Sequence, residues 1–302
     1  MSKQYFGAIE LGGTKTNVLI ADDQNNPVAK KVFPTLSPTE TVADIARFIK
    51  TTVVSEGVEL KSIGIGSFGT LDLHPDSKTF GFITTTPKLG WEFFDIKGKI
   101  ESELDVHAEI DTDVNAAALG EYSFKAMQTI QNLVYITIGT GIGAGFIVNG
   151  ELLHGLVHPE FGHIRLPHDR RIDPFPGICP YHRDCFEGLA SGPALAERWR
   201  MPADEIPQEH VAWDLEGEYI AYALSDLICT VSPEKIILGG GVMHRYYLYD
   251  IIRAKTIQIM NNYIRSRYLE ESIGDYIISP RWKNESGLMG ALCLAYHSSK
   301  PD

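Results

Sequence analysis

The sequence has no long apolar run and no recognisable leader. Nothing in its 302 residues approaches the roughly 20 consecutive apolar residues that span a bilayer. Residues 1–7 contain no apolar segment ending in a small-residue cleavage site, so we expect no secretion signal. Cysteine is scarce, and in a reducing compartment four cysteines are more often buried thiols or metal ligands than disulfides. We therefore expect a cytoplasmic protein.

Positive charge is also in short supply. The chain has 27 Lys and Arg against 39 Asp and Glu, which gives a formal net charge of −12. This excess repels nucleic-acid backbones and anionic membranes, so we expect neither as a partner. A small phosphorylated ligand held by backbone N–H groups stays compatible with it. Apolar residues make up 44%, as in ordinary globular proteins, and the length suits about two domains.

The expected elements follow a similar order in the two halves of the chain. Hydrophobic periodicity and turn residues predict the first set at these positions: strands at 5–9, 16–20, 28–33, 63–66 and 107–110, and helices at 39–54, 96–104 and 115–124. The second set begins after residue 132: strands at 133–138, 144–148, 151–153, 236–238 and 276–278, and helices at 216–231, 248–263 and 286–296. Thr39 is predicted to cap the first helix, and Asn149 with Gly150 to form a type I′ hairpin turn. This order predicts two α/β lobes, 1–125 and 126–302, with a boundary near 124–132 and a cleft between them.

Three glycine-rich turns, at residues 11–15, 139–143 and 239–241, each follow a β-type run. Glycine lets backbone N–H groups approach phosphate oxygens without a Cβ in the way. Each turn taken alone could be only a tight hairpin, and neither the Walker nor the dinucleotide pattern is met. Thr14 and Lys15 add a hydroxyl and a cation to the first turn, as a phosphate clamp needs, although Lys15 could equally be a solvated edge lysine.

Asp113 lies where a predicted strand ends and a predicted helix begins. Ligands of open α/β sheets collect at the carboxyl ends of strands. A carboxylate at that position can accept the proton of an attacking hydroxyl, as an aspartate does in protein kinases. The alternative is that Asp113 only caps the Ala-rich helix that follows. The spacing by itself leaves both interpretations open.

A further candidate is a metal site. Cys179, His182 and Cys185 lie within seven residues and offer ligands suited to tetrahedral Zn²⁺, and His163 is the nearest candidate for the fourth. A reversible disulfide between Cys179 and Cys185, or a chance cluster, are the alternatives. Zinc with four protein ligands would be structural, and it would pin the loop so that Glu160 and Glu187 point into the cleft. The two other cysteines lie in apolar helical patterns and are predicted to pack in the core: Cys229 and Cys293.

At these motifs the chain resembles the ROK family of sugar kinases and repressors, over residues 10–291. The resemblance implies an α/β, actin-like or hexokinase-type (ribonuclease H-like) fold, with two lobes closing over ATP and sugar. It places the catalytic base at Asp113 and the nucleotide contacts at Gly12, Gly13, Thr14, Lys15, Thr16, Gly139, Thr140, Gly141, Gly143, Gly239, Gly240 and Gly241. It places the sugar contacts at Gly69, Thr86, Asn115, Glu160, His163 and Glu187, and the zinc ligands at His163, Cys179, His182 and Cys185.

Within that family the chain resembles the bacterial fructokinase branch. The features are Glu10 in the first phosphate loop, the Thr-Pro-Lys run in residues 84–91, and Cys-Pro-Tyr-His at 179–182. Thr70 is a departure, because relatives commonly have proline there. The implied function is ATP- and Mg²⁺-dependent conversion of D-fructose to fructose 6-phosphate by a homodimer, with mannose or glucose as alternative substrates. A DNA-binding repressor is disfavoured because only nine residues precede Glu10, and a catalytically dead sugar sensor because the motifs are intact.

Overall fold

The computed structural model describes residues 3–123, 127 and 129–298. The chain divides into two compact units: unit 1 is Met1–Gln128, Leu152–Pro159 and Glu285–Asp302, and unit 2 is Thr129–Glu151 and Glu160–Asn284. Both units are therefore discontinuous, unlike the two continuous lobes predicted from the sequence. Phe124, the predicted end of a helix, lies outside the described residues.

Unit 1 is built on a five-stranded sheet with the strand order β3-β2-β1-β4-β7. Its strands are β1 (Tyr5–Leu11), β2 (Lys15–Asp22), β3 (Pro27–Pro34), β4 (Leu60–Ser67) and β7 (Ala108–Thr112). Strand β1 is antiparallel to β2 and parallel to β4, which is in turn parallel to β7. A small antiparallel pair follows β4: β5 (Phe82–Ile83) and β6 (Phe94–Asp95).

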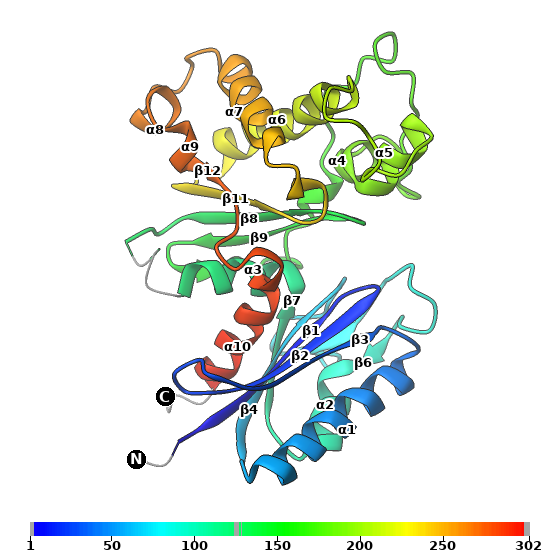
Figure 1. Ribbon diagram of the computed structural model, residues 1–302, viewed down its shortest axis with the longest axis vertical. Helices are drawn as coiled ribbons and strands as arrows, with labels where there is room; N and C mark the ends of the chain where they lie inside the picture. Colours follow the sequence, from blue (N-terminus) through cyan, green and yellow to red (C-terminus); the bar gives the residue numbers. More distant parts are fainter. Residues whose placement is uncertain (1–2, 124–126, 128, 299–302) are drawn as a thin grey trace. The chain divides into compact units, whose positions relative to one another are not determined.

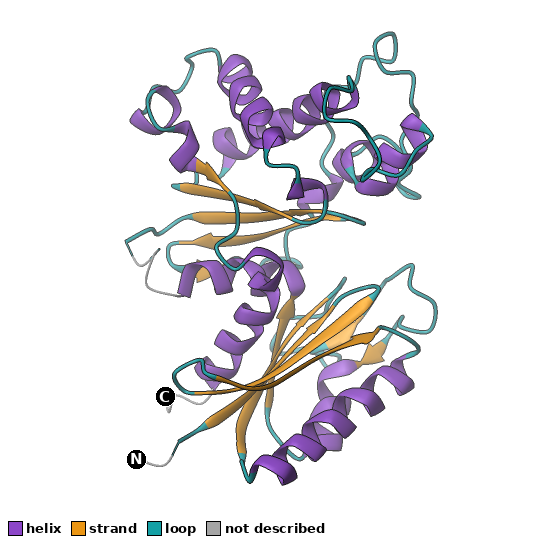
Figure 2. Ribbon diagram, viewed as in Figure 1, coloured by secondary structure: helices purple, strands orange, loops and turns teal. Residues whose placement is uncertain are grey.

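Helices cover both faces of this sheet, as Figures 1 and 2 show. One face carries α1 (Pro38–Glu56) and α2 (Ile96–Leu104), and the other carries α3 (Asp113–Ser123) and α10 (Ser286–Ser298). Alternate residues of β4 serve the two faces: Ile63 and Ile65 belong to the apolar core with α1, whereas Gly64 and Gly66 lie against α3 and α10.

Helix α10 belongs to unit 1 because glycines bring it close to its neighbours. A Cβ on Gly64 would overlap the carbonyl oxygen of Ala291, and a Cβ on Gly290 would overlap that of Ala116 in α3. The last predicted helix is thereby confirmed, but it completes the first unit of the fold and not the second. Continuous lobes could not anticipate this pairing, because the glycines that permit it are far apart in the sequence.

Unit 2 contains a second five-stranded sheet with the order β10-β9-β8-β11-β12. Its strands are β8 (Leu133–Ile138), β9 (Ile142–Val148), β10 (Glu151–Leu152), β11 (Lys235–Gly239) and β12 (Ile277–Ile278). Strand β8 is antiparallel to β9 and parallel to β11. Asn149 and Gly150 both have positive φ, at 55° and 83°, which confirms the predicted turn. The two sheets share one pattern, so the duplication of element order is confirmed.

The remaining helices of unit 2 are α4 (Phe186–Ala190), α5 (Gly192–Trp199), α6 (Ala212–Thr230), α7 (Tyr247–Met260), α8 (Arg267–Glu270) and α9 (Ile273–Tyr276). The 3₁₀ helices among the described residues are η1 (Phe161–His163), η2 (Val242–His244) and η3 (Lys283–Glu285). The short helices α4, α5, α8 and α9 were not predicted. In the described part of the chain no helix has the length and apolarity needed to cross a membrane.

Helix α1 corrects one predicted cap. Ser37, and not Thr39, is the N-cap: its Oγ accepts the N–H of Glu40 at 3.4 Å, and the Glu40 side chain accepts the Ser37 N–H at 3.3 Å. The reason is that Pro38 occupies the first helical position, where its missing N–H costs nothing. The helix therefore begins before Thr39.

Candidate active site

In unit 1 the parallel strands bring three loops to one edge of the sheet. Glu10 pairs with Gly66, which pairs with Asp111, so β1, β4 and β7 end together. Their carboxyl ends lead into the first glycine loop, the loop at Gly69 and the turn at Asp113. This is the edge where open α/β sheets bind ligands.

The first glycine loop is held by hydrogen bonds from below. Gly12 donates its N–H to the carbonyl oxygen of Lys15 at 3.0 Å, and the hydroxyl of Thr35 donates to the Gly12 carbonyl at 2.8 Å. Thr16 is buried, and its Oγ1 lies 2.8 Å from that of Thr35, so it supports the loop from inside. Gly13 is exposed, with open space where a Cβ would stand. The predicted nucleotide residues Thr14 and Lys15 are exposed as well.

Lys88 also contacts this loop, and the Thr-Pro-Lys run is the feature of the sequence that pointed towards it. Its Nζ donates to the carbonyl oxygens of Gly13 at 2.6 Å and of Thr35 at 3.2 Å. Thr86 lies two residues earlier and accepts the Lys88 N–H at 3.3 Å. One lysine thus ties the loop that carries a predicted sugar contact to the first glycine loop.

Asp113 is the first residue of α3, and the capping role falls to its neighbour. The hydroxyl of Thr112 accepts the N–H of Asn115 at 3.0 Å, whereas Asp113 Oδ1 accepts the adjacent Val114 N–H at 2.9 Å. The helix therefore begins two residues before the predicted start. The Asp113 side chain is half-buried, and burial raises the pKa of its carboxyl to about 6. The carboxylate is ionised at neutral pH and still basic enough to take a proton.

Glu10 provides a second carboxyl with a raised pKa. Burial raises the pKa of Glu10 to about 7; a hydrogen bond from Asn17 opposes the rise and the charge of Asp113 adds to it. Asn17 Nδ2 donates to Glu10 Oε2 at 2.7 Å. A Cβ on Gly287 of α10 would overlap the Glu10 carboxyl, so the last helix closes against this group.

Asp111 and the segment Leu152–Pro159 add contacts that were not predicted. Asp111 is buried; its Oδ1 accepts the side-chain N–H of Asn115 at 2.7 Å, and its Oδ2 lies 2.8 Å from Nε2 of His154. The predicted sugar contact Asn115 is thus fully buried and bound to Asp111. The peptide bond before Thr70, the predicted departure, is cis, and the Leu71 N–H is donated to Nε2 of His158 at 3.2 Å.

In unit 2 the second glycine loop connects β8 and β9 as the predicted hairpin. Gly139 donates its N–H to the carbonyl oxygen of Gly141 at 2.9 Å. Glu187, predicted as a sugar contact, accepts the N–H of Ile142 at 2.9 Å, and a Cβ on Gly141 would stand 2.8 Å from its Oε2. Its carboxylate therefore lies against the second glycine loop. Glu160, the other predicted carboxylate, is exposed at the N-terminus of η1.

The third glycine loop follows β11 and lines a cavity of about 180 Å³. Gly240 has φ of 90° and lies so close to the backbone of Ile138 that only glycine fits. Gly241 has open space where a Cβ would stand. The sequence did not indicate the other residues of the cavity: Met243, His244, Tyr246, Tyr249, Ser279, Pro280, Lys283 and Asn284.

The four predicted zinc ligands lie together, with all ligand atoms within 4.8 Å of one another. His163 Nδ1 is 3.7 Å from Cys179 Sγ and 3.6 Å from Cys185 Sγ, and His182 Nδ1 is 3.7 Å from Cys179 Sγ. Zn–S bonds of about 2.3 Å and Zn–N bonds of about 2.0 Å at tetrahedral angles separate S and N by roughly 3.6 Å. The donor set therefore fits zinc, and both cysteines are free thiols.

The other two cysteines differ from each other. Cys293 is buried in α10, as predicted. Cys229 is exposed on α6, so its predicted place in the core is wrong. Cys229 lies near the end of that helix, next to the exposed Thr230. At this point the side chains no longer face the core.

A model of the ROK family matches residues 6–298. The chain belongs to the ROK family. A putative fructokinase of Bacillus subtilis (strain 168) is 43% identical over 294 residues, covering 97% of this chain and 95% of that protein. A fructokinase of Lactococcus lactis subsp. cremoris is 43% identical over 293 residues, covering 97% of each. The crystal structure of a ROK hexokinase from Thermus thermophilus matches with a TM-score of 0.77 at 24% identity, covering 98% of this chain and 99% of that one. The fold is accordingly the actin-like, hexokinase-type fold of this family.

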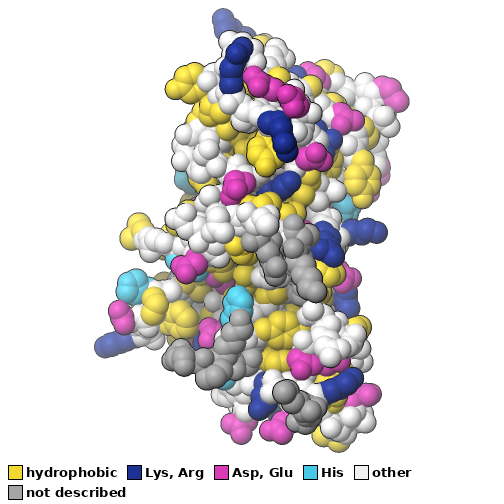
Figure 3. Space-filling model, turned by 90° about the vertical axis from the view of Figure 1, so that its left-hand side faces the viewer, with side chains coloured by type: hydrophobic (Ala, Val, Ile, Leu, Met, Phe, Trp, Pro, Cys, Tyr) yellow, Lys and Arg dark blue, Asp and Glu magenta, His cyan; other side chains and the backbone are white. Residues whose placement is uncertain are grey.

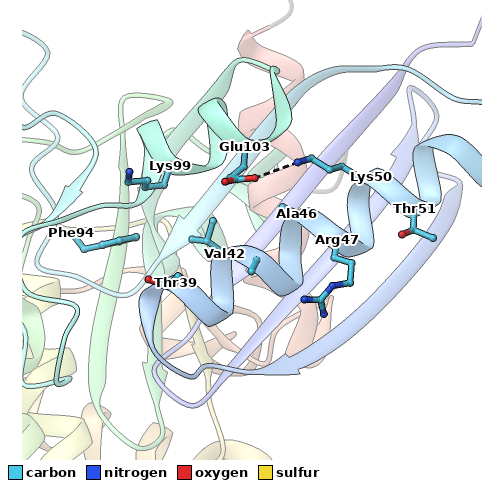
Figure 4. A pocket seen from close by; sticks show the side chains of 10 residues that line it. Thr39, Val42, Ala46, Arg47, Lys50, Thr51, Phe94, Lys99 and Glu103 are labelled. Atoms are coloured by element: carbon cyan, nitrogen blue, oxygen red, sulfur yellow. Dashed lines mark hydrogen bonds and ion pairs between the residues drawn. The ribbon is translucent and has the colours of Figure 1, made fainter.

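This ROK protein also has a groove of about 520 Å³ between α1 and α2, away from the predicted site residues (Figure 4). Lys50 and Glu103 form an ion pair of 3.3 Å across it, and Val42 and Ala46 line its floor. Figure 3 shows acidic and basic side chains interspersed over the face that it draws. The charged side chains that line this groove are exposed, and none of the residues predicted for the site is among its lining residues.

Proposed function

We propose that this ROK protein is an ATP-dependent kinase that converts D-fructose to fructose 6-phosphate. The observation that carries the proposal is Asp113, a half-buried carboxylate in the first turn of α3, at the sheet edge shared with the first glycine loop. The choice of fructose is supported by the fructokinases of B. subtilis and L. lactis, to which the chain is 43% identical.

In the proposed reaction Asp113 is the general base. It accepts the proton of the sugar hydroxyl while the hydroxyl oxygen forms a bond to the γ-phosphorus and the bond to ADP breaks. Its pKa of about 6 suits this role, because the carboxylate is unprotonated at neutral pH and remains a useful base. Lys15 and the glycine loops hold the phosphates, and Mg²⁺ bound with ATP would neutralise part of their charge. Catalysis then rests mainly on positioning and charge stabilisation.

The sugar contacts form the next part of the proposal. Glu160, Glu187, Gly69 and Thr86 offer oxygens or backbone groups to the sugar hydroxyls. Asn115 acts through Asp111, because its side chain is fully buried and bound to that carboxylate. The predicted homodimer and the cytoplasmic location stay predictions.

We further propose that His163, Cys179, His182 and Cys185 hold one structural zinc. The support is their S–N distances of 3.6 and 3.7 Å. Four protein ligands leave no open position, so zinc would supply rigidity and no substrate binding. Glu187 follows Cys185 by two residues and accepts the Ile142 N–H, so these ligands hold that carboxylate against the second glycine loop. For His163 this leaves Nε2 as the atom that can reach a sugar.

The test is a coupled ADP-release assay with fructose, mannose, glucose and N-acetylated hexosamines. We expect the highest kcat/KM with fructose, by at least about tenfold, since loss of one hydroxyl contact costs that much or more. The position of the phosphate is read from the product. A higher kcat/KM for mannose or glucose would make that sugar the substrate in place of fructose. If no hexose were turned over, the kinase proposal would fail.

A further inference from the structure

The segment Leu152–Pro159 belongs to unit 1, although the residues on both sides of it belong to unit 2. Two histidines attach it. Nε2 of His154 lies 2.8 Å from Asp111 Oδ2, and Nε2 of His158 lies 3.2 Å from the Leu71 nitrogen. These contacts join residues that are 43 and 87 positions apart in the chain. The segment is therefore fastened to unit 1 at two separate places.

His158 reaches the loop that follows β4. It is 5% exposed, and a Cβ on Gly69 would stand 3.2 Å from its Nε2, so the ring touches both Gly69 and Leu71. Because its Nε2 accepts the Leu71 N–H, that nitrogen must be unprotonated. Burial lowers the pKa of His158, with the charges of Asp111 and His154 acting in opposite directions. The ring is thus held in the form that can accept.

His154 reaches the turn that carries Asp113. Its partner Asp111 lies two residues before Asp113 in the sequence. Asp111 also accepts the backbone N–H of Thr112 and a side-chain N–H of Asn115. The hydrogen bond to Asp111 raises the pKa of His154, and burial opposes the rise. Both oxygens of the Asp111 carboxylate therefore accept hydrogen bonds. The donor that comes from the Leu152–Pro159 segment is the imidazole of His154.

We propose that His158 and His154 are positioning residues for the sugar, because they fasten the segment Leu152–Pro159 to the Gly69–Leu71 loop and to the turn before Asp113. The inference rests on the proposed kinase function and adds residues that neither the motifs nor the family resemblance indicated. The next residue of the chain after this segment is Glu160, the proposed sugar contact.

The same geometry says which substrate should be affected. Thr35 and Lys88 hold the first glycine loop, whereas His158 contacts the loop after β4 and His154 contacts Asp111. Loss of a histidine should therefore weaken the use of sugar and leave the use of ATP unchanged. A merely structural role would lower the stability and raise both KM values together.

The decisive variants are His158→Leu and His158→Gln, compared with His74→Gln, a substitution at an exposed histidine of unit 1. We expect His158→Leu to raise the fructose KM at least about tenfold with the ATP KM within twofold, as for a lost buried hydrogen bond. The amide oxygen of glutamine can accept the Leu71 N–H, so His158→Gln should recover most of the affinity. An unchanged fructose KM in His158→Leu, or equal rises for fructose and ATP, overturns the inference.

His154 provides a second test. Its side chain is 41% exposed, so substituting it should not disturb the packing of the core. His154→Leu should raise the fructose KM and keep the melting temperature within about 2 °C, and His154→Gln, which can donate to Asp111, should resemble wild type. A fructose KM equal to wild type in His154→Leu removes His154 from the proposal.

Hydrogen exchange separates this inference from the proposed function. The Leu71 amide should exchange at least about tenfold faster in His158→Leu than in wild type, and at the wild-type rate in His74→Gln. If wild type phosphorylated no hexose, the kinase proposal would fail, and unchanged exchange at Leu71 would overturn the inference on its own.

Discussion

Unit 1 and unit 2 each contain a five-stranded sheet whose last four strands in that order have matching directions, yet the two sheets differ in the groups near the carboxyl ends of their parallel strands. At the edge of unit 1, two carboxyls have raised pKa values, Glu10 and Asp113. In unit 2 the carboxyl ends of β8 and β11 lead into two glycine loops, and this unit also contains the Cys/His cluster. In unit 2 the carboxyl with the most strongly raised pKa is Glu216, which is buried in α6. The same strand order thus lies beside two carboxyls with raised pKa values in one unit and beside two glycine loops in the other.

Removing the proposed base of unit 1 tests this difference between the units most directly. Asp113→Asn should lower kcat by about 10²- to 10⁴-fold, the usual contribution of a general base, with both KM values within a few-fold. Steady-state kinetics with fructose and ATP measure this. Asp76→Asn, at an exposed position of the same unit, is the matched control and should keep full activity. A kcat within a few-fold of wild type in Asp113→Asn would remove the base assignment.

A second experiment removes the metal cluster from unit 2. Cys179→Ser should reduce zinc from one per chain to a small fraction of that and lower kcat/KM by about 10- to 100-fold, because Glu187 loses its anchor. Metal analysis by plasma mass spectrometry and the coupled assay provide the measurements. Cys229→Ser, at the exposed cysteine of α6, should change neither. Full zinc content in Cys179→Ser would contradict the assignment.

The pH dependence sharpens the role of unit 1. Burial raises the pKa of Asp113 to about 6, and a base is active only when unprotonated. As the pH falls through 6, kcat/KM should therefore fall, reaching about tenfold per pH unit below it. Glu10, with a pKa of about 7, is the competing source, so the profile of Glu10→Gln decides between them. In Glu10→Gln the fall of kcat/KM near pH 6 should persist. A kcat/KM that stays constant down to pH 5 in that variant would mean that the fall arises from Glu10.

The smallest effect concerns stability alone. Helix α1 of unit 1 has a side-chain cap at Ser37, whereas the long helices α6 and α7 of unit 2 have none. Ser37→Ala should lower the free energy of unfolding by about 1 kcal/mol without changing the kinetics. Thr39→Ala, at the residue predicted to be the cap, is the control and should have a smaller effect. Denaturant titration resolves the two, and equal losses would mean that the capping box is not responsible.

Most of the elements could be predicted because their signals are local. Periodicity located α2 and β8 to the residue, and the Asn149-Gly150 pair fixed its turn. The glycine loops and Asp113 could be placed at strand ends for the same reason. The first helical residue of α3 could not be located, because Thr112 and Asp113 are both good caps and only the backbone geometry selects Thr112.

The contacts that escaped prediction join distant residues. His158 to Leu71, His154 to Asp111 and Lys88 to Gly13 depend on which loops the parallel strands place side by side. No spacing in the sequence encodes these pairs. The exposure of Cys229 escaped for a different reason, because an apolar helical pattern does not show where its stripe leaves the core.

The position of α10 has a consequence for the order in which the chain matures. This helix closes against α3 and Glu10, yet it follows all of unit 2 in the sequence. During translation unit 2 can therefore fold before α10 has been made, while the face of the first sheet that α10 covers is still exposed. Glu10 reaches its buried position only when α10 docks, so the raised pKa of this carboxyl is established last in a nascent chain.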